Sequence, residues 1–344
     1  MSEQVQISDE HFMRQALRLG RFGLGRTAPN PSVGCVLTRD GQVIATGFTQ
    51  DGGRPHAEAM VLAAANNTAS GAIRGATAYV TLEPCAHQGQ TPPCAGSLRD
   101  AGVARVVYAI DDPDPRVSGG GAAMLRDAGV EVTRGVLAAQ AQRDQLGFLL
   151  TKTEGRPMVT LKLALSKNGF MRTPPGESPW ITGPLARQQG HKLRAQHDAI
   201  ITGSGTVHED DPSLDCRLPG LEGASPMPVV MGKTALPIDS KLAARAKSED
   251  VMIYKEEAPA AVLADLAARG ITRTMLECGP RLAAAFLAED LVDELAVFTA
   301  PHEVAMAGES DISLMQLELS RFTEVHAATL GPDSYTHYAR ERKI

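Results

Sequence analysis

Three residues in the N-terminal half of the sequence have the side chains of a zinc site. His56 opens one expected helix, and Cys85 and Cys94 lie in the segment that leads into the next. One imidazole and two thiolates supply the nitrogen and sulfur donors that Zn²⁺ prefers, and a catalytic zinc ion keeps its fourth position for water. A helix N-terminus lowers the pKa of a nearby thiol, so this placement favours the ligating thiolate form. We therefore expect His56, Cys85 and Cys94 to be metal ligands.

Glu58 follows His56 by two residues and falls in the first turn of the same expected helix. There it can take a proton from a water molecule at the metal and deliver it to a leaving amine. A His-x-Glu sequence followed by Pro-Cys is the pattern of zinc deaminases. Any one of these residues alone is more often structural, but their occurrence together predicts a catalytic site with Glu58 as its acid and base. The other cysteines, Cys35, Cys216 and Cys278, are interpreted as packing residues.

Strands and helices alternate around this cluster. The first half has patterns typical of helices at 9–21 and 57–66, a helix ending near 102, and strands at 34–38, 43–47, 78–82 and 105–110. After a turn-like segment at 150–157, helices are expected at 183–196, 259–269 and 280–289, and strands at 158–165, 199–202, 229–231, 251–254, 274–277, 294–300, 322–327 and 335–339. Such alternation favours α/β layers with a largely parallel sheet. We expect two α/β domains, at 1–149 and 150–344.

Composition limits the classes of function. The chain has 344 residues and a formal net charge of −6, and neither half is basic, which argues against a nucleic-acid partner because phosphate contacts need a basic surface. No apolar run approaches the roughly 18 residues of a membrane span, and the N-terminal segment lacks the apolar core of a signal peptide. The five cysteines are too few and too scattered for a disulfide framework. We therefore expect a cytoplasmic protein without a membrane partner.

The cysteine spacing identifies a family. Eight residues separate Cys85 from Cys94, whereas deaminases of nucleosides and nucleic acids usually have two between these cysteines. With PNPSVG at 29–34 upstream, this segment closely resembles the bifunctional riboflavin-biosynthesis deaminase/reductase family. The resemblance covers most of the chain and continues in SPWIT at 178–182, LRA at 193–195, GTV at 205–207, DDPSL at 210–214 and LECGP at 276–280.

This resemblance implies a fold and two reactions. It implies an N-terminal cytidine-deaminase-like three-layer domain followed by a dihydrofolate-reductase-like α/β domain. The first domain would use zinc to remove an amino group from a diaminopyrimidinone that carries a ribosylamino 5'-phosphate. The second would use NADPH to reduce the ribose to a ribityl chain. The partner is then a small phosphate-bearing molecule, and we expect the protein to be a homo-oligomer.

The resemblance also implies binding residues. In the first domain, Asn30 and His87 match positions that bind the pyrimidine. In the second domain, the residues expected to bind NADPH are Ala164, Trp180, Thr206, Asp210, Gly279, Pro280 and Arg281. Those expected to bind substrate there are Ser178, Arg194, Leu214, Arg217 and Glu277. Two of these, Arg194 and Arg217, can clamp a phosphate by charge-assisted hydrogen bonds, and a helix beginning at Gly279-Pro280 can receive a cofactor phosphate.

Several positions depart from the family's pattern. Gln90 replaces a Lys or Arg, Thr49 replaces a His, and Asn168 and Phe170 replace an Asp and a Lys or Arg. The segment 301–305 also lacks the usual Leu-Gly-Gly. A second hypothesis therefore stays open: a zinc deaminase of a nucleoside or an RNA base, whose C-terminal half is a non-catalytic accessory or oligomerisation module. Acidic character in both halves and the long cysteine spacing argue against it.

Overall fold

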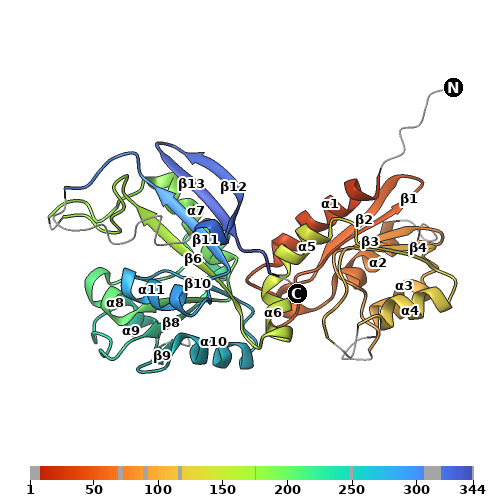
Figure 1. The fold of residues 1–344 in the computed structure, drawn as a ribbon. Coiled ribbons are helices and arrows are strands. Elements are labelled where there is room, and N and C mark those ends of the chain that lie inside the picture. Colours follow the sequence, from red (N-terminus) through yellow and green to blue (C-terminus); the bar gives the residue numbers. More distant parts are fainter. Residues whose placement is uncertain are drawn as a thin grey trace. The chain divides into compact units, whose positions relative to one another are not determined.

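The chain divides into two compact units, Met1–Glu154 and Gly155–Ile344, which Figure 1 draws as a ribbon. The computed structural model describes residues 8–68, 73–87, 92–114, 118–174, 176–247, 251–305 and 319–342. The division between the units falls within residues 150–157, the segment expected to be turn-like, although a helix continues to Thr153 in the structure. Each unit has its own sheet and its own hydrophobic core. Among the described residues, no helix is both long and apolar enough to cross a bilayer.

The sheet of the first unit has the strand order β2-β1-β3-β4-β5. Its strands are β1 (Gly34–Arg39), β2 (Gln42–Phe48), β3 (Thr77–Val80), β4 (Arg105–Tyr108) and β5 (Glu131–Arg134). β1 pairs antiparallel with both β2 and β3, whereas β3, β4 and β5 are parallel. The Asp40-Gly41 step predicts a hairpin of β1 and β2, which is confirmed. Because β1 is also antiparallel to β3, the sheet of this unit is mixed, and the prediction of a largely parallel sheet is wrong here.

Helices cover both faces of this sheet, as Figure 1 shows. They are α1 (Asp9–Gly20), α2 (Ala57–Thr68), α3 (Cys94–Asp100), α4 (Gly120–Asp127), α5 (Ala138–Asp144) and α6 (Leu146–Thr153), with short 3₁₀ turns η1 (Arg21–Gly23) and η2 (Asp51–Gly53). On one face α1 contacts α5, and on the other α3 contacts both α2 and α4. Apolar side chains such as Met13 of α1 and Val61 of α2 are fully buried between these layers. The expected three-layer arrangement is confirmed.

The sheet of the second unit has the order β12-β13-β11-β6-β10-β7-β8-β9. Its strands are β6 (Met158–Leu165), β7 (Ala199–Gly203), β8 (Met227–Met231), β9 (Met252–Tyr254), β10 (Arg273–Leu276), β11 (Glu294–Thr299), β12 (Thr323–Leu330) and β13 (Asp333–Ala339). From β11 to β9 all neighbouring strands are parallel, and β13 is antiparallel to both β11 and β12. The expectation of a largely parallel sheet is confirmed here.

Alternation along β6 divides the two faces of this sheet. Residues 159, 161, 163 and 165 face a core that includes Val262 and Phe286 of the helices α10 (Pro259–Ala268) and α11 (Pro280–Ala288). The opposite face packs against α7 (Pro184–Ala195), α8 (Ser204–Asp210) and α9 (Lys241–Arg245). The 3₁₀ turns η3 (Glu222–Ala224) and η4 (Leu319–Arg321) lie in connections. Thr160, Lys162 and Ala164 consequently share the face toward α7.

Candidate functional sites

The three expected metal ligands come together in the first unit. His56 precedes α2, Cys85 lies in the loop after β3, and Cys94 begins α3. The Nδ1 atom of His56 is 3.3 Å from Cys94 Sγ and 3.9 Å from Cys85 Sγ. All three donor atoms lie within 4.8 Å of one another. The fold therefore brings one nitrogen and two sulfur donors from three separate elements to one point.

This donor set fits a zinc ion. A tetrahedral ion with bonds of about 2.0–2.3 Å holds its ligand atoms roughly 3.3–3.8 Å apart, close to the separations found between His56 and the two cysteines. Hydrogen bonds from the Cys94 thiol and from His56 lower the pKa of Cys85 to about 4, against the effect of burial. The same hydrogen bond and burial raise the pKa of Cys94. The two sulfurs lie close enough to share one proton, and a bound cation would take that proton's place.

Glu58 lies beside the three ligands in the first turn of α2. This residue is 4% exposed, and its carboxyl group lies close to the sulfurs of Cys85 and Cys94. Burial, and then the negative charge of Cys85, raise the pKa of Glu58 to about 7. A carboxyl group in this environment can be either protonated or ionised near neutral pH, as a general acid and base must be. The structure thus places Glu58 where the sequence pattern predicts it.

The expected pyrimidine-binding residues lie in loops. The side chain of Asn30 lies directly against Gly53, where a Cβ would come within 2.1 Å of Asn30 Nδ2 and where φ is +82°. Only glycine fits there, so η2 and the Asn30 loop are fixed against each other. His87 is exposed, and Gln90 lies outside the described residues. Thr49 exchanges hydrogen bonds with the backbone of Val33 through its hydroxyl, so this residue joins β2 to the start of β1.

In the second unit, Glu277 joins two of the basic side chains on the α7 side of the sheet. Arg194 donates from Nε and Nη2 to the Glu277 carboxylate at 3.0–3.1 Å, and Lys162 Nζ donates to Glu277 Oε1 at 3.1 Å. Burial would raise the pKa of Glu277, but the charges of Arg194 and Lys162 lower it to about 2. Lys162 was not among the residues expected from the sequence. Lys162 is the charged residue in the mostly apolar sequence of β6, and that charge was the signal that could have found it.

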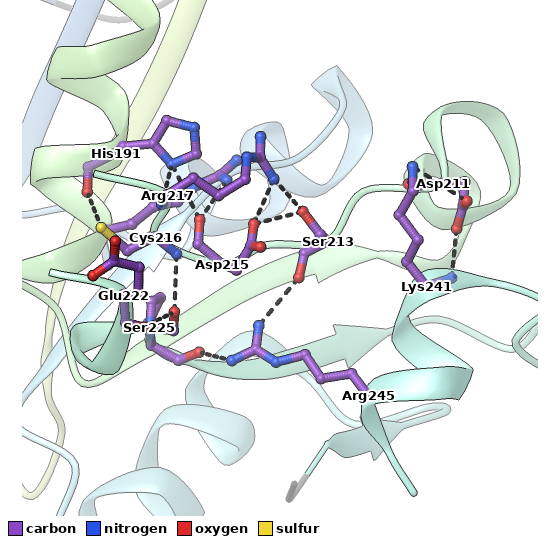
Figure 2. Close-up of polar contacts among 12 residues, drawn as sticks. His191, Asp211, Ser213, Asp215, Cys216, Arg217, Glu222, Ser225, Lys241 and Arg245 are labelled. Carbon is purple, nitrogen blue, oxygen red and sulfur yellow. Dashed lines mark hydrogen bonds and ion pairs between the residues drawn. The ribbon is translucent and has the colours of Figure 1, made fainter. Parts of the chain in front are cut away.

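A loop that follows α8 carries a second basic group next to this cluster, and Figure 2 shows its contacts. Arg217 donates to the Ser213 hydroxyl and to Asp215 Oδ1. The Asp215 carbonyl in turn accepts a hydrogen bond from Arg194 Nη1 at 3.0 Å. Arg245 donates to the carbonyls of Ser213 and Pro226. The expected substrate residues Arg194 and Arg217 are therefore connected through one short segment, 213–217.

The other expected residues of this unit fall into different environments. Leu214 is 1% exposed and packs in the core, so its side chain faces protein. Burial raises the pKa of Asp210, and the negative charges of Glu209 and then Glu277 raise it further. Asp210 therefore lies near the Glu277 carboxylate. Thr206 Oγ1 lies 3.8 Å from the position of a Cβ on Gly279, and Gly279 precedes α11, whose first residues are Pro280 and the exposed Arg281. Thr206 and the start of α11 are thus neighbours at the carboxyl ends of β7 and β10.

Trp180 and Ser178 lie by a cavity of about 540 Å³. The Ser178 hydroxyl accepts a hydrogen bond from the Trp180 amide at 3.3 Å, and the indole is 57% exposed. The Arg187 guanidinium lies 4.8 Å from the centre of the Trp180 ring, which is a cation–π contact. His302 and Asp333 also line this cavity. The two predicted residues Ser178 and Trp180 therefore face an open space in the second unit.

The two departures from the family's pattern in the second unit contact each other. Asn168 Oδ1 accepts from the Val304 amide at 3.1 Å, and Asn168 Nδ2 donates to the Val304 carbonyl at 3.0 Å. The Lys167 amide donates to the His302 carbonyl at 2.8 Å. Phe170 is 5% exposed. Segments 166–170 and 301–305 are therefore joined by hydrogen bonds.

Two family models match the sequence. Residues 6–110 match the cytidine and deoxycytidylate deaminase zinc-binding region, and residues 157–335 match the RibD C-terminal domain. The chain is 36% identical to riboflavin biosynthesis protein RibD of Escherichia coli, over 96% of this chain and 99% of that protein. It is 50% identical to the Haemophilus influenzae protein of the same name over 206 residues, which are 60% of this chain and 54% of that protein.

A solved structure agrees over nearly the full length. The diaminohydroxyphosphoribosylaminopyrimidine deaminase/5-amino-6-(5-phosphoribosylamino)uracil reductase of Thermotoga maritima superimposes with a TM-score of 0.85 at 30% identity. The match covers 96% of this chain and 98% of that chain. The deaminase region and the reductase region occur in the same order along the present sequence. The chain therefore belongs to the RibD family of riboflavin biosynthesis proteins.

Proposed function

We propose that this chain catalyses two consecutive reactions of riboflavin biosynthesis. The first is the zinc-dependent hydrolytic deamination of 2,5-diamino-6-(5-phosphoribosylamino)pyrimidin-4-one, and the second is the NADPH-dependent reduction of the ribosyl chain of the product to ribityl. The observation that carries the proposal is the convergence of His56, Cys85 and Cys94 beside the buried Glu58. The second unit, which matches the RibD C-terminal domain, supports the reductive step over a non-catalytic accessory role.

In the first reaction, His56, Cys85 and Cys94 would hold the metal ion. When bound, zinc makes a coordinated water molecule a stronger acid. The Glu58 carboxylate accepts a proton from the attacking water and then gives a proton to the departing amino group, so that water enters and ammonia leaves. Asn30 and His87 are proposed to hold the pyrimidine. Burial of Glu58 keeps bulk water from competing for the proton.

In the second reaction, bound NADPH would supply the hydride, with Ala164, Trp180, Thr206, Asp210 and the segment Gly279 to Arg281 as its proposed site. Arg194 and Arg217 are proposed to bind the ribose phosphate, because guanidinium groups match a phosphate with paired hydrogen bonds. Ser178 and Glu277 complete the proposed substrate site, together with Leu214, whose buried side chain leaves only its backbone to contact a substrate. When hydride adds to C1' of the opened sugar imine, the nitrogen must gain a proton. Lys162, an ammonium in the same cluster, is our candidate proton donor.

We further propose that residues 1–149 and 150–344 are the two catalytic domains and that the protein works in the cytoplasm as a homo-oligomer. Five free thiols favour a reducing compartment. The net charge of −6 favours a small-molecule partner over nucleic acid. Size-exclusion chromatography with light scattering would test the oligomeric state.

The decisive experiment supplies the purified protein with zinc, NADPH and the diaminopyrimidine substrate. Ammonia release and loss of NADPH absorbance are followed together. We expect one ammonia to be released and one NADPH to be oxidised for each molecule of substrate. Ammonia release without any NADPH consumption, even when the deaminated compound is added directly, would contradict the reductase half of the proposal. Activity on a nucleoside or on RNA, and none on the phosphoribosylaminopyrimidine, would contradict the proposed substrate.

A further inference from the structure

Glu83 is a buried carboxylate that neither reaction uses. It lies in the loop after β3, two residues before Cys85, and is 2% exposed. Its Oε2 accepts a hydrogen bond from the Gly119 amide and its Oε1 accepts one from the Ala122 amide, both at 3.0 Å. The first amides of a helix have no partner within the helix, and Gly119, at the start of α4, has no side chain to supply one. The two carboxylate oxygens of Glu83, a residue distant in the sequence, act as the acceptors for these amides.

The first turn of α4 also lies directly against the peptide that enters Cys85. A Cβ built on Gly121 would come within 1.8 Å of the Pro84 carbonyl oxygen. No residue larger than glycine fits at this position without moving one of the two segments. The chain from Glu83 to Cys85 is therefore held to α4 by hydrogen bonds at Glu83 and by close backbone packing at Pro84.

On its other side, Cys85 is held by α3. The Cys85 carbonyl accepts a hydrogen bond from the Ala95 amide at 3.1 Å, and the Cys94 amide donates to Cys85 Sγ at 3.4 Å. α3 and α4 contact each other. Cys85 thus lies between two helices, and only α3 carries a metal ligand. The position of the Cys85 sulfur depends on α4 as well, although α4 contributes no donor atom.

We propose that Glu83 is a positioning residue of the zinc site, which fixes Cys85 by joining the start of α4 to the ligand loop. Groups that orient metal ligands without touching the metal typically change metal affinity by about 10–100-fold when they are removed. The inference rests on the zinc site of the proposed function. It adds that the glycine-rich start of α4 is part of the same metal-binding unit.

Two substitutions in the full-length protein test this role, with a third as a matched control. Glu83→Gln keeps the shape of the side chain but turns an NH₂ group toward one of the amides, and Gly121→Ala displaces the Pro84 peptide without changing any charge. We expect each to weaken zinc binding by about 10–100-fold in competition with a chromogenic chelator. Gly96→Ala lies in α3 beside Cys94, where a Cβ meets nothing nearer than 3.9 Å, and should bind zinc as the wild type does.

A second measurement separates positioning from simple stabilisation of α4. If Glu83 positions Cys85, the rise in melting temperature that zinc causes becomes smaller in Glu83→Gln, and the sulfur-to-metal charge-transfer band of the Co²⁺-loaded protein changes. If the melting temperatures of the zinc-free and the zinc-loaded Glu83→Gln protein fall by the same amount and its zinc affinity is unchanged, the inference is wrong. Should Glu83→Gln not fold, wild-type zinc affinity in Gly121→Ala overturns it equally. A wild-type protein that binds no zinc would instead overturn the proposed function.

Discussion

We propose that Glu58 serves both proton transfers of the deamination, because it is buried beside the expected metal ligands. We predict that Glu58→Gln keeps its zinc but loses deamination by a factor of about 10²–10⁴, the usual contribution of a positioned acid and base. Ammonia release is measured alongside zinc content by atomic absorption. Glu10→Gln, at an exposed position of α1, serves as the control and should keep full activity. Retained deamination in Glu58→Gln would exclude the assigned role.

Arg194, which we propose binds the substrate phosphate, contacts Glu277 and the Asp215 carbonyl. We predict that Arg194→Ala lowers kcat/KM for reduction by roughly 10–100-fold, because a hydrogen bond to a charged group contributes about 1.5–3 kcal/mol. Deamination in the same preparation should not change. Lys192→Ala, at an exposed position of the same helix, is the control. An equal loss in both reactions would argue against a separate reductase site.

At the scale of elements, the strand and helix pattern of the sequence predicted β6, α10 and α11 almost to the residue. It missed α4, because the three glycines at 119–121 are unfavourable in a helix. The hydrogen bonds to Glu83 and the close packing against Pro84 stabilise this helix start in spite of the glycines. Both residues are distant from α4 in the sequence. The same reason limited the site: the zinc ligands form local patterns that a sequence reveals, whereas Lys162 and Glu83 gain their partners only through the fold.

A buried polar chain joins α7 to three strands of the second sheet. His197 Nδ1 donates to the Leu193 carbonyl, and its Nε2 lies 2.9 Å from Thr160 Oγ1. The Thr160 hydroxyl oxygen also lies 2.9 Å from Glu294 Oε2, and Glu294 pairs with His337 of β13 at 3.3 Å. Burial, with a smaller effect of the Arg273 charge, lowers the pKa of His197 to about 3. The folded protein therefore keeps His197 neutral at acidities where the unfolded chain binds a proton.

This difference predicts how stability varies with pH. The contribution of neutral His197 to the free energy of unfolding is fully present above about pH 6.5. It is lost as the pH falls toward 3, because in this range only the unfolded state takes up the proton. Between pH 6.5 and 4.5 the second unit should lose on the order of 2 kcal/mol of unfolding free energy through this residue. Urea unfolding, followed by the fluorescence of Trp180, the single Trp in the chain, measures it. In His197→Gln the loss over this interval should be much smaller, and an unchanged slope would contradict the prediction.

Glu294 extends the same behaviour to lower pH. Burial would raise its pKa, but the hydrogen bond and charge of His337, with Arg273 and Thr160, lower it from 4.5 to about 2. Its stabilising effect is therefore present above pH 4.5 and is lost between 4.5 and 2. We predict that Glu294→Gln flattens the stability curve below pH 4.5 and leaves the slope above pH 5 unchanged. A change confined to the range above pH 5 would show that another group is responsible.

For the whole molecule, the proposed zinc ligands and Glu58 belong to Met1–Glu154, and the proposed reductase residues Lys162, Arg194, Arg217 and Glu277 belong to Gly155–Ile344. Each unit thus has its own core and its own set of functional side chains. Two such sets in one polypeptide suit two consecutive reactions, in which the product of the first carries the same phosphate into the second. The length of the chain alone allowed two domains or one large one, and the assignment of one reaction to each unit required the residues themselves.

This separation predicts the effect of removing the metal from the intact protein. Treatment with a chelator should abolish deamination, because Glu58 then has no acidified water from which to take a proton. Reduction of 5-amino-6-(5-phosphoribosylamino)uracil, supplied directly, should continue at the rate of the untreated protein, since none of the residues proposed for the reductase site is a proposed zinc ligand. Ammonia release and NADPH absorbance are measured before chelation, after chelation and after zinc is restored. If chelation slows both reactions and zinc restores both, the two sites are coupled through the metal-binding unit, and the independence inferred from the separate residue sets is wrong.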